Sequence, residues 1–317
     1  MLLQLLLMAL GFVLLIKGAD WLVDGASSLA KKYHVSDLAI GLTIVAFGTS
    51  MPEFVVNTFA AFQGHNDIVF GNIIGSNNFN LFLILGISGL ITPLVVQSST
   101  VWKEIPLSLV AAILLFFLVN DSYIGGNSIL SRIDGIVLLI MFAYFLYYVY
   151  KNLTGDTNEQ DMKYKVMVSW KMWLFILLGF AGLIAGGRIV VNAAVKIASN
   201  LGVSEKIIAL TIIAAGTSLP ELATSAVAAF KKNADIAIGN IIGSNIFNIF
   251  FILGVSSLIH PVQYKLSFNF DLYVLIFGTI LLFITMFTGG KKKLDRWEAL
   301  ILLLLYVGYT IYMILQE

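Results

Sequence analysis

The chain contains the same unit twice. Shifting the sequence by 168 residues places residues 204–261 over residues 36–93 without a gap, and 33 of these 58 positions are identical. The identities concentrate in two polar motifs: GTS-x-PE at Gly48–Glu53 and Gly216–Glu221, and GNIIGSN-x-FN at Gly71–Asn80 and Gly239–Asn248. A duplicated unit predicts two related halves with the repeated polar residues at equivalent places.

Both motifs lie in apolar segments. The chain is 59% hydrophobic and 12% charged, with a mean hydropathy of +0.93, which is typical of a polytopic membrane protein. Its 317 residues allow about ten spans of ~20 residues each. The first 16 residues run on into Lys17 and Asp20 without a cleavage site, so we interpret them as the first helix. These two side chains, three residues apart, could pair on one helix face.

Apolar runs recur five times in each half. They fall at 2–24, 37–62, 68–92, 104–119 and 130–150, then at 168–195, 205–230, 236–259, 270–287 and 297–315. Because five is odd, the second copy enters the membrane from the opposite side. We therefore predict an all-α membrane protein of about ten transmembrane helices in two inverted-topology five-helix repeats, with helices 2, 3, 7 and 8 broken. Residues 1–150 form the first repeat, 151–167 a cytoplasmic linker, and 168–317 the second, inverted repeat.

Basic residues are distributed unevenly between the two sides. The loops after helices 1, 3, 5, 7 and 9 carry thirteen Lys and Arg, and the other side carries five. The positive-inside rule then predicts both termini on the non-cytoplasmic side of an integral, multi-pass protein of the plasma (inner) membrane. A net charge of +1 argues against nucleic acid as a partner. The bilayer is the expected surrounding, and nothing indicates an obligatory protein partner.

Each GTS-x-PE motif places an acid inside an apolar span. An ionised carboxylate near the bilayer centre costs roughly 3 kcal/mol, and no Lys or Arg lies near Glu53 or Glu221 in the sequence. The prolines of the motifs, Pro52 and Pro220, have no N–H, so the helices should break there and expose backbone carbonyls. Two facing carboxylates would be neutralised by a divalent cation. The competing interpretation of the small and hydroxylated residues is close helix packing.

The available ligands fit Ca²⁺, which takes six to eight oxygens in irregular geometry. Two carboxylates offer up to four, and broken-helix carbonyls at Thr49 and Thr217 could supply others. Mg²⁺ and Zn²⁺ fit less well, because they require tighter octahedral geometry or His and Cys ligands. Further neutral oxygens, which suit Na⁺, come from Ser50, Ser76, Ser218, Ser244, Asn80 and Asn248. Asn72 and Asn240 lie on the same helix stripe and are either ligands or interhelical hydrogen-bond partners.

The paired motifs resemble those of the cation/calcium antiporter superfamily, and most closely its prokaryotic Na⁺/Ca²⁺ exchangers. The resemblance implies alternating access, with Ca²⁺ and Na⁺ as transported ions and no other cofactor. It implies that Glu53 and Glu221 hold Ca²⁺, and that helices 1 and 6 slide as a unit against the other eight. The flanking Na⁺ sites would use Thr49, Ser50, Ser76, Thr217, Ser218, Ser244 and the carbonyls of Ala46 and Ala214.

The resulting expectation is a secondary active antiporter that exchanges Na⁺ for Ca²⁺, and not an enzyme, because no nucleophile–base set appears. K⁺-dependent exchange is an alternative that the neutral Asn248 weakens, since K⁺-dependent exchangers are among the relatives that rely on an acid there. Ca²⁺/H⁺ antiport is a second alternative. A cation channel built from the two carboxylates is a third, although most channel filters are assembled around the pore axis.

Overall fold

The computed structural model describes residues 2–120, 128–152, 167–201, 214–289 and 292–315, and these residues are almost entirely helical. The first half comprises α1 (Leu2–Tyr33), α2 (Asp37–Ile40), η1 (Gly41–Val45), α3 (Ala46–Thr49), α4 (Met51–Gln63), α5 (Asn66–Asn78), η2 (Phe79–Ile84), α6 (Leu85–Ile91), β1 (Leu94–Val95), η3 (Thr100–Glu104), α7 (Ile105–Val119), β2 (Ile129–Leu130) and α8 (Arg132–Lys151). The second half comprises α9 (Ser169–Asn200), α11 (Ala214–Gly216), α12 (Leu219–Phe230), α13 (Ala234–Ile246), η6 (Phe247–Leu253), α14 (Gly254–Ile259), β3 (Val262–Gln263), η7 (Leu266–Phe268), α15 (Asn269–Thr285), β4 (Lys293–Leu294) and α16 (Arg296–Leu315).

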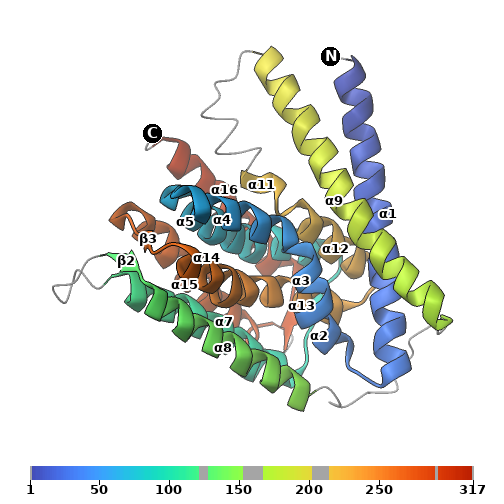
Figure 1. Cartoon of the computed structure of the whole chain (residues 1–317). Helices are drawn as coiled ribbons and strands as arrows, with labels where there is room; N and C mark the ends of the chain where they lie inside the picture. Colours follow the sequence, from blue (N-terminus) through green and yellow to red (C-terminus); the bar gives the residue numbers. More distant parts are fainter. Residues whose placement is uncertain (1, 121–127, 153–166, 202–213, 290–291, 316–317) are drawn as a thin grey trace.

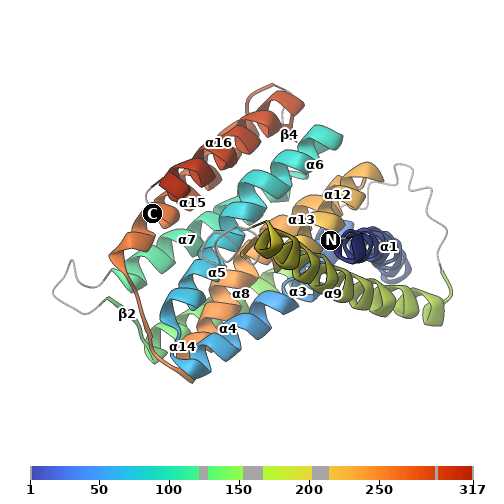
Figure 2. The same cartoon turned by 90° about the horizontal axis from the view of Figure 1, so that it is seen from above.

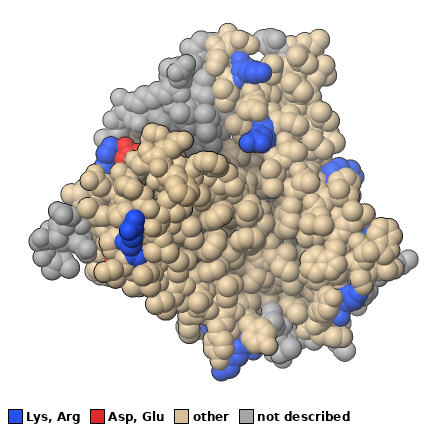
Figure 3. Space-filling model, viewed as in Figure 1, with Lys and Arg blue, Asp and Glu red and all other residues tan. Residues whose placement is uncertain are grey.

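These helices are arranged as a bundle with a predominantly apolar surface. Eight described helices are long and apolar enough to cross a membrane, and a bent pair, Asp37–Thr49 with Met51–Gln63, adds a ninth. The short apolar helix α12 occupies the end of the predicted seventh span, whose residues 205–213 lie outside the described ranges. On the face drawn in Figure 3, basic and acidic side chains form a few separate patches and most of the surface carries neither. The predicted all-α membrane architecture is confirmed.

The predicted interruptions take two different forms. The second span bends by 49° between Thr49 and Met51, and Pro52 lies in the first turn of the helix that follows. The third and eighth spans, Asn66–Ile91 and Ala234–Ile259, are instead continuous helices. Each contains a π-helical segment, η2 or η6, that begins one residue beyond the repeated GSN triplet, after Asn78 or Ile246. The prediction of breaks in helices 3 and 8 is therefore corrected to π-helical turns, which redirect side chains without freeing a long stretch of backbone.

Four two-residue strands connect the halves in pairs. β1 pairs antiparallel with β4, and β2 pairs antiparallel with β3. Leu94 in β1 and Val262 in β3 are equivalent under the 168-residue shift, so each pair joins one strand from each half. Since β1 precedes α7 and β2 follows it, the two pairs lie at opposite ends of that helix. This arrangement is the one that an inverted repeat produces.

The two longest helices, α1 and α9, lie side by side at one edge of the bundle (Figures 1 and 2). Glycines at seven-residue intervals line the seam, at Gly11, Gly18 and Gly25 on α1 and at Gly179 and Gly186 on α9. A Cβ placed on Gly18 would lie 2.9 Å from the carbonyl oxygen of Gly179, and one on Gly186 would lie 2.8 Å from that of Gly11. The backbones approach this closely because no side chain separates them.

Helix α1 runs to Tyr33, nine residues beyond the apolar run that predicted it. Its acidic residues do not pair with Lys17 as the sequence suggested. Lys231, at the end of α12, contacts the carboxylates of Asp20 at 2.7 Å and Asp24 at 2.6 Å. The neutralisation of these carboxylates by another element allows the helix to continue past its apolar stretch.

Candidate ion-binding site

The two broken helices place their glutamates in equivalent positions. Glu53 lies in the first turn of α4 and Glu221 in the first turn of α12, and both are about 99% buried. The residues at the break have matching backbones, with φ −82° and ψ 6° at Ser50 and φ −89° and ψ 7° at Ser218. Proline cannot donate a backbone hydrogen bond and begins a helix readily, which fixes the break directly before each glutamate.

Each glutamate accepts a hydrogen bond from the serine of the opposite half. Ser50 Oγ donates to Glu221 Oε1 at 2.9 Å, and Ser218 Oγ donates to Glu53 Oε1 at 2.8 Å. Ser76 Oγ, on α5, lies 3.4 Å from Glu53 Oε1 and 3.0 Å from Ser218 Oγ. The two carboxylates are therefore linked through serines to the opposite half of the chain.

The remaining oxygens of this site have no donor. Within the described residues, five buried side-chain oxygens lack a hydrogen-bond partner here: Glu53 Oε2, Glu221 Oε2, Asn80 Oδ1, Asn248 Oδ1 and Ser244 Oγ. The π-helical segment that carries Asn80 packs on α12, and the one that carries Asn248 packs on α4. None of the ion pairs found between described residues includes either glutamate. Each buried acceptor without a donor lowers the stability of the fold, and a cation bound between these five oxygens would offset that cost.

The threonines of the breaks donate hydrogen bonds across the halves. Thr49 Oγ1 donates to Asn240 Oδ1 at 3.0 Å, and Thr217 Oγ1 donates to Asn72 Oδ1 at 3.3 Å. Asn240 in turn donates to Ser225 Oγ at 2.9 Å. Asn72 and Asn240 therefore act as interhelical hydrogen-bond partners in this structure, one of the two roles left open by the sequence.

The two predicted backbone ligands differ in what the structure describes. The carbonyl of Ala46 accepts the backbone N–H of Ser50 at 3.0 Å, and Thr49 Oγ1 lies 3.3 Å from it. This carbonyl is thus hydrogen-bonded within the last turn before the break. Ala214 is the first residue of α11 and lies at the edge of the described part of the chain.

Two asparagines were missed by the sequence interpretation. Asn77 and Asn245 are the last residues of the two GSN triplets, and both are buried within hydrogen-bond distance of the candidate ligands Asn80 and Asn248. The signal was present, because these residues are repeated at equivalent positions and polar in an apolar helix.

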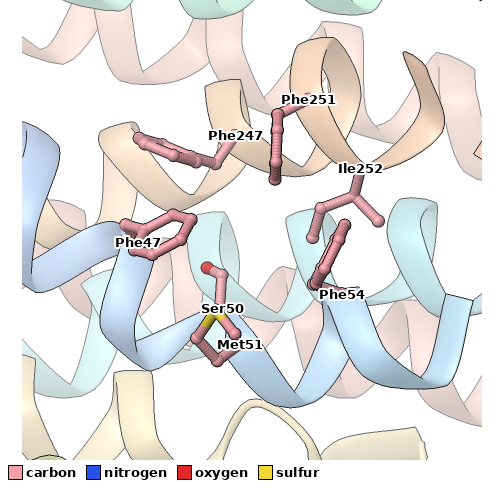
Figure 4. Close-up of a pocket in the computed structure, with 7 residues that line it drawn as sticks. All are labelled: Phe47, Ser50, Met51, Phe54, Phe247, Phe251 and Ile252. Carbon is pink, nitrogen blue, oxygen red and sulfur yellow. The ribbon is translucent and has the colours of Figure 1, made fainter. Parts of the chain in front are cut away.

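Four phenylalanine side chains cover one side of the site at Ser50. Figure 4 shows a small hollow at Ser50, where Phe47 and Phe54 of the bent span face Phe247 and Phe251 of η6. The rings of Phe54 and Phe251 stack with centroids 5.3 Å apart, and those of Phe47 and Phe247 are 5.7 Å apart. The hollow is lined by apolar side chains apart from Ser50.

The sequence of the chain matches a family profile, described as sodium/calcium exchanger protein, over residues 3–151 and 171–315. The chain belongs to the sodium/calcium exchanger family. The two matched ranges correspond closely to the two five-helix halves, with the connecting segment left out.

Individual members of this family are similar over nearly their whole length. CaxA of Alkalimonas amylolytica is 39% identical over 318 residues, covering 98% of both chains. The sodium/calcium exchanger MaX1 of Methanosarcina acetivorans is 32% identical over 341 residues, covering 96% of this chain and 97% of its own. A solved structure of the sodium-calcium exchanger NCX_Mj, soaked with Na⁺ and Ca²⁺, superposes with a TM-score of 0.82 at 34% identity and 96% coverage of each chain.

Proposed function

We propose that this protein is a secondary active antiporter that exchanges Na⁺ for Ca²⁺ across a membrane by alternating access at the Glu53–Glu221 site. The observation that carries the proposal is the set of buried, donor-free oxygens on those two glutamates and on Asn80 and Asn248. Two carboxylate charges match one Ca²⁺, and the four groups supply oxygens of the kind that Ca²⁺ takes. The names of MaX1 and NCX_Mj support the same ion pair.

The proposed roles divide by charge. Glu53 and Glu221 hold Ca²⁺, and Asn80 and Asn248 complete its oxygen ligands. Neutral hydroxyls around them serve Na⁺: Thr49, Ser50, Ser76, Thr217, Ser218 and Ser244, together with the carbonyls of Ala46 and Ala214. Two Na⁺ would replace the charge of one Ca²⁺. Because either ion set needs the negative charge of Glu53 and Glu221 to be stable in this buried site, the site cannot hold both sets at once, and this competition couples their movements.

The proposed moving part is the pair α1 and α9. Their glycine seam joins them tightly to each other. Phe180 of α9 also lies against the bent second span, because a Cβ on Gly48 would overlap the Phe180 ring at 1.9 Å. Sliding of the two-helix unit would therefore displace Gly48, which directly precedes Thr49 and Ser50. We further propose residues 1–150 and 168–317 as the two repeats joined by a cytoplasmic linker at 151–167.

The proposed location is the plasma membrane, with both termini outside the cytoplasm. The chain has no cysteine, so a single introduced thiol reports sidedness directly. In whole cells, a Lys151→Cys variant should react with a membrane-impermeant maleimide only after the membrane has been permeabilised. Labelling of intact cells would reverse the proposed orientation.

The function itself is tested by flux in proteoliposomes. Vesicles loaded with Na⁺ and diluted into Na⁺-free medium should take up ⁴⁵Ca²⁺, and vesicles without a Na⁺ gradient should not. Omitting K⁺ should leave uptake intact, and a pH gradient alone should not drive it. Uptake that required K⁺, followed the pH gradient, or persisted without any counter-ion would replace the proposal with K⁺-dependent exchange, H⁺ exchange or a channel respectively.

A further inference from the structure

Four buried asparagines form a symmetric cluster where the third and eighth spans cross. They are Asn77 and Asn80 from the first half and their equivalents Asn245 and Asn248 from the second, none more than 2% exposed. Asn77 Nδ2 donates to the backbone carbonyl of Asn245 at 3.2 Å, and Asn245 Nδ2 donates to that of Asn77 at 3.3 Å. The two residues thus bond reciprocally to each other's main chain.

The same two residues also bond to the candidate ligands of the opposite half. Asn248 Nδ2 donates to Asn77 Oδ1 at 2.9 Å, and Asn80 Nδ2 donates to Asn245 Oδ1 at 3.0 Å. The other end of each ligand amide, Asn80 Oδ1 or Asn248 Oδ1, is buried without a donor. Each pair therefore joins a residue that ends a GSN triplet to a residue inside a π-helical segment.

The direction of every amide follows from the backbone. A carbonyl oxygen only accepts hydrogen bonds, so the end of Asn77 that faces the carbonyl of Asn245 has to be its NH₂. The oxygen of Asn77 is then left to face Asn248, which has to present its NH₂ in return. The carbonyl oxygen of Asn248 consequently points away from Asn77. In the same way, the carbonyl of Asn77 fixes the amide of Asn245, which in turn fixes the amide of Asn80.

We propose that Asn77 and Asn245 are positioning residues, each of which holds the amide of the opposite half's ligand, Asn248 or Asn80, with its oxygen toward the ion. The inference rests on the proposed function, because it assigns these amide oxygens to Ca²⁺. A reversed amide would direct its NH₂ at the cation and its oxygen at another oxygen. Aspartate needs no such orientation, since both ends of its carboxylate are acceptors.

This difference provides a test by crossed rescue. The series consists of Asn77→Ala, the same change with Asn248→Asp, and the same change with Asn80→Asp. ⁴⁵Ca²⁺ binding to purified protein is measured at equilibrium without Na⁺, and the Ca²⁺ KM and kcat of exchange are measured in vesicles. Asn77→Ala should weaken Ca²⁺ binding by about tenfold, as loss of a group that orients a metal ligand typically does, and should raise KM more than it lowers kcat.

Adding Asn248→Asp should recover most of this loss, because a carboxylate presents an oxygen to the ion whichever way it turns. Adding Asn80→Asp should recover little, because Asn80 is still oriented by Asn245. Equal recovery by both would mean that charge alone matters, and recovery by neither would assign Asn77 to helix packing; either result overturns the proposal.

The other half of the molecule repeats the test with exchanged partners. Asn245→Ala should be rescued by Asn80→Asp and not by Asn248→Asp. If neither Asn77→Ala nor Asn245→Ala yields folded protein, the cluster is a packing element and the proposal fails. A wild type that does not bind ⁴⁵Ca²⁺ would instead remove the proposed function, so the two failures are distinguishable.

Discussion

The glycine seam between α1 and α9 makes a quantitative prediction for Gly18→Ala. The added Cβ would lie 2.8 Å from the backbone nitrogen of Leu183 and 2.9 Å from the carbonyl oxygen of Gly179. Ordinary contacts to carbon are about 3.5–4.0 Å, so the helices have to separate locally by roughly 0.6–1.2 Å. A gap of about 0.5–1 Å already loses a quarter to a half of the dispersion energy of each contact that it opens. Both obstacles are main-chain atoms, which cannot rotate aside.

Overpacking of this kind costs about 1–3 kcal/mol, which corresponds to a fall in Tm of about 2–5 °C for a chain of this size. Thermal unfolding of detergent-purified protein measures the change. The matched control is Gly308→Ala in α16, where an added Cβ meets nothing within 4 Å and the gain in helix propensity should hold or raise Tm. If Gly18→Ala melts at the same temperature as this control, the seam is not close-packed and the argument for a two-helix unit fails.

Two other substitutions test contacts on either side of the site. Ser218→Ala removes the 2.8 Å hydrogen bond to Glu53 and a proposed Na⁺ ligand. Because a hydrogen bond to a charged group contributes about 1.5–3 kcal/mol, half-maximal exchange should need about tenfold more Na⁺; an unchanged Na⁺ dependence would contradict its role. Lys231→Met strips the partly buried Asp24 of its 2.6 Å partner and should lower Tm clearly more than Lys265→Met, whose ion pair is largely exposed and worth about 0–1 kcal/mol. Equal Tm values for the two variants would show that Lys231 does not hold α1 in place.

Most of the architecture could be predicted because polar residues are so conspicuous in an apolar chain. The 168-residue repeat indicated two inverted halves, and proline before an acid indicated the bend that the structure places between Thr49 and Met51. The same reasoning failed for the third and eighth spans. There the polar residues are accommodated by π-helical turns, which keep the backbone hydrogen-bonded and have no proline or glycine signature of their own.

The hydrogen-bond and ion-pair partners of these residues could not be predicted from the sequence, for a different reason. Ser50 bonds to Glu221 and Ser218 to Glu53, and Asp20 pairs with Lys231 rather than with nearby Lys17. Periodicity indicates which residues share a face of one helix, but not which helix from the other half lies against that face. Asn77 and Asn245 could have been singled out as repeated polar residues, but their bonds to Asn248 and Asn80 of the other half could not be predicted in the same way.

The central claim is that two carboxylates from the two halves together hold one Ca²⁺. Equilibrium binding of ⁴⁵Ca²⁺ to purified wild type, Glu53→Gln and Glu221→Gln tests it most directly. Glu104→Gln is the matched control, because Glu104 is equally buried but accepts a hydrogen bond from Tyr148 outside the site. The account predicts one Na⁺-displaceable Ca²⁺ per wild-type or control chain and none in either site variant. Full binding in Glu53→Gln or Glu221→Gln would contradict it.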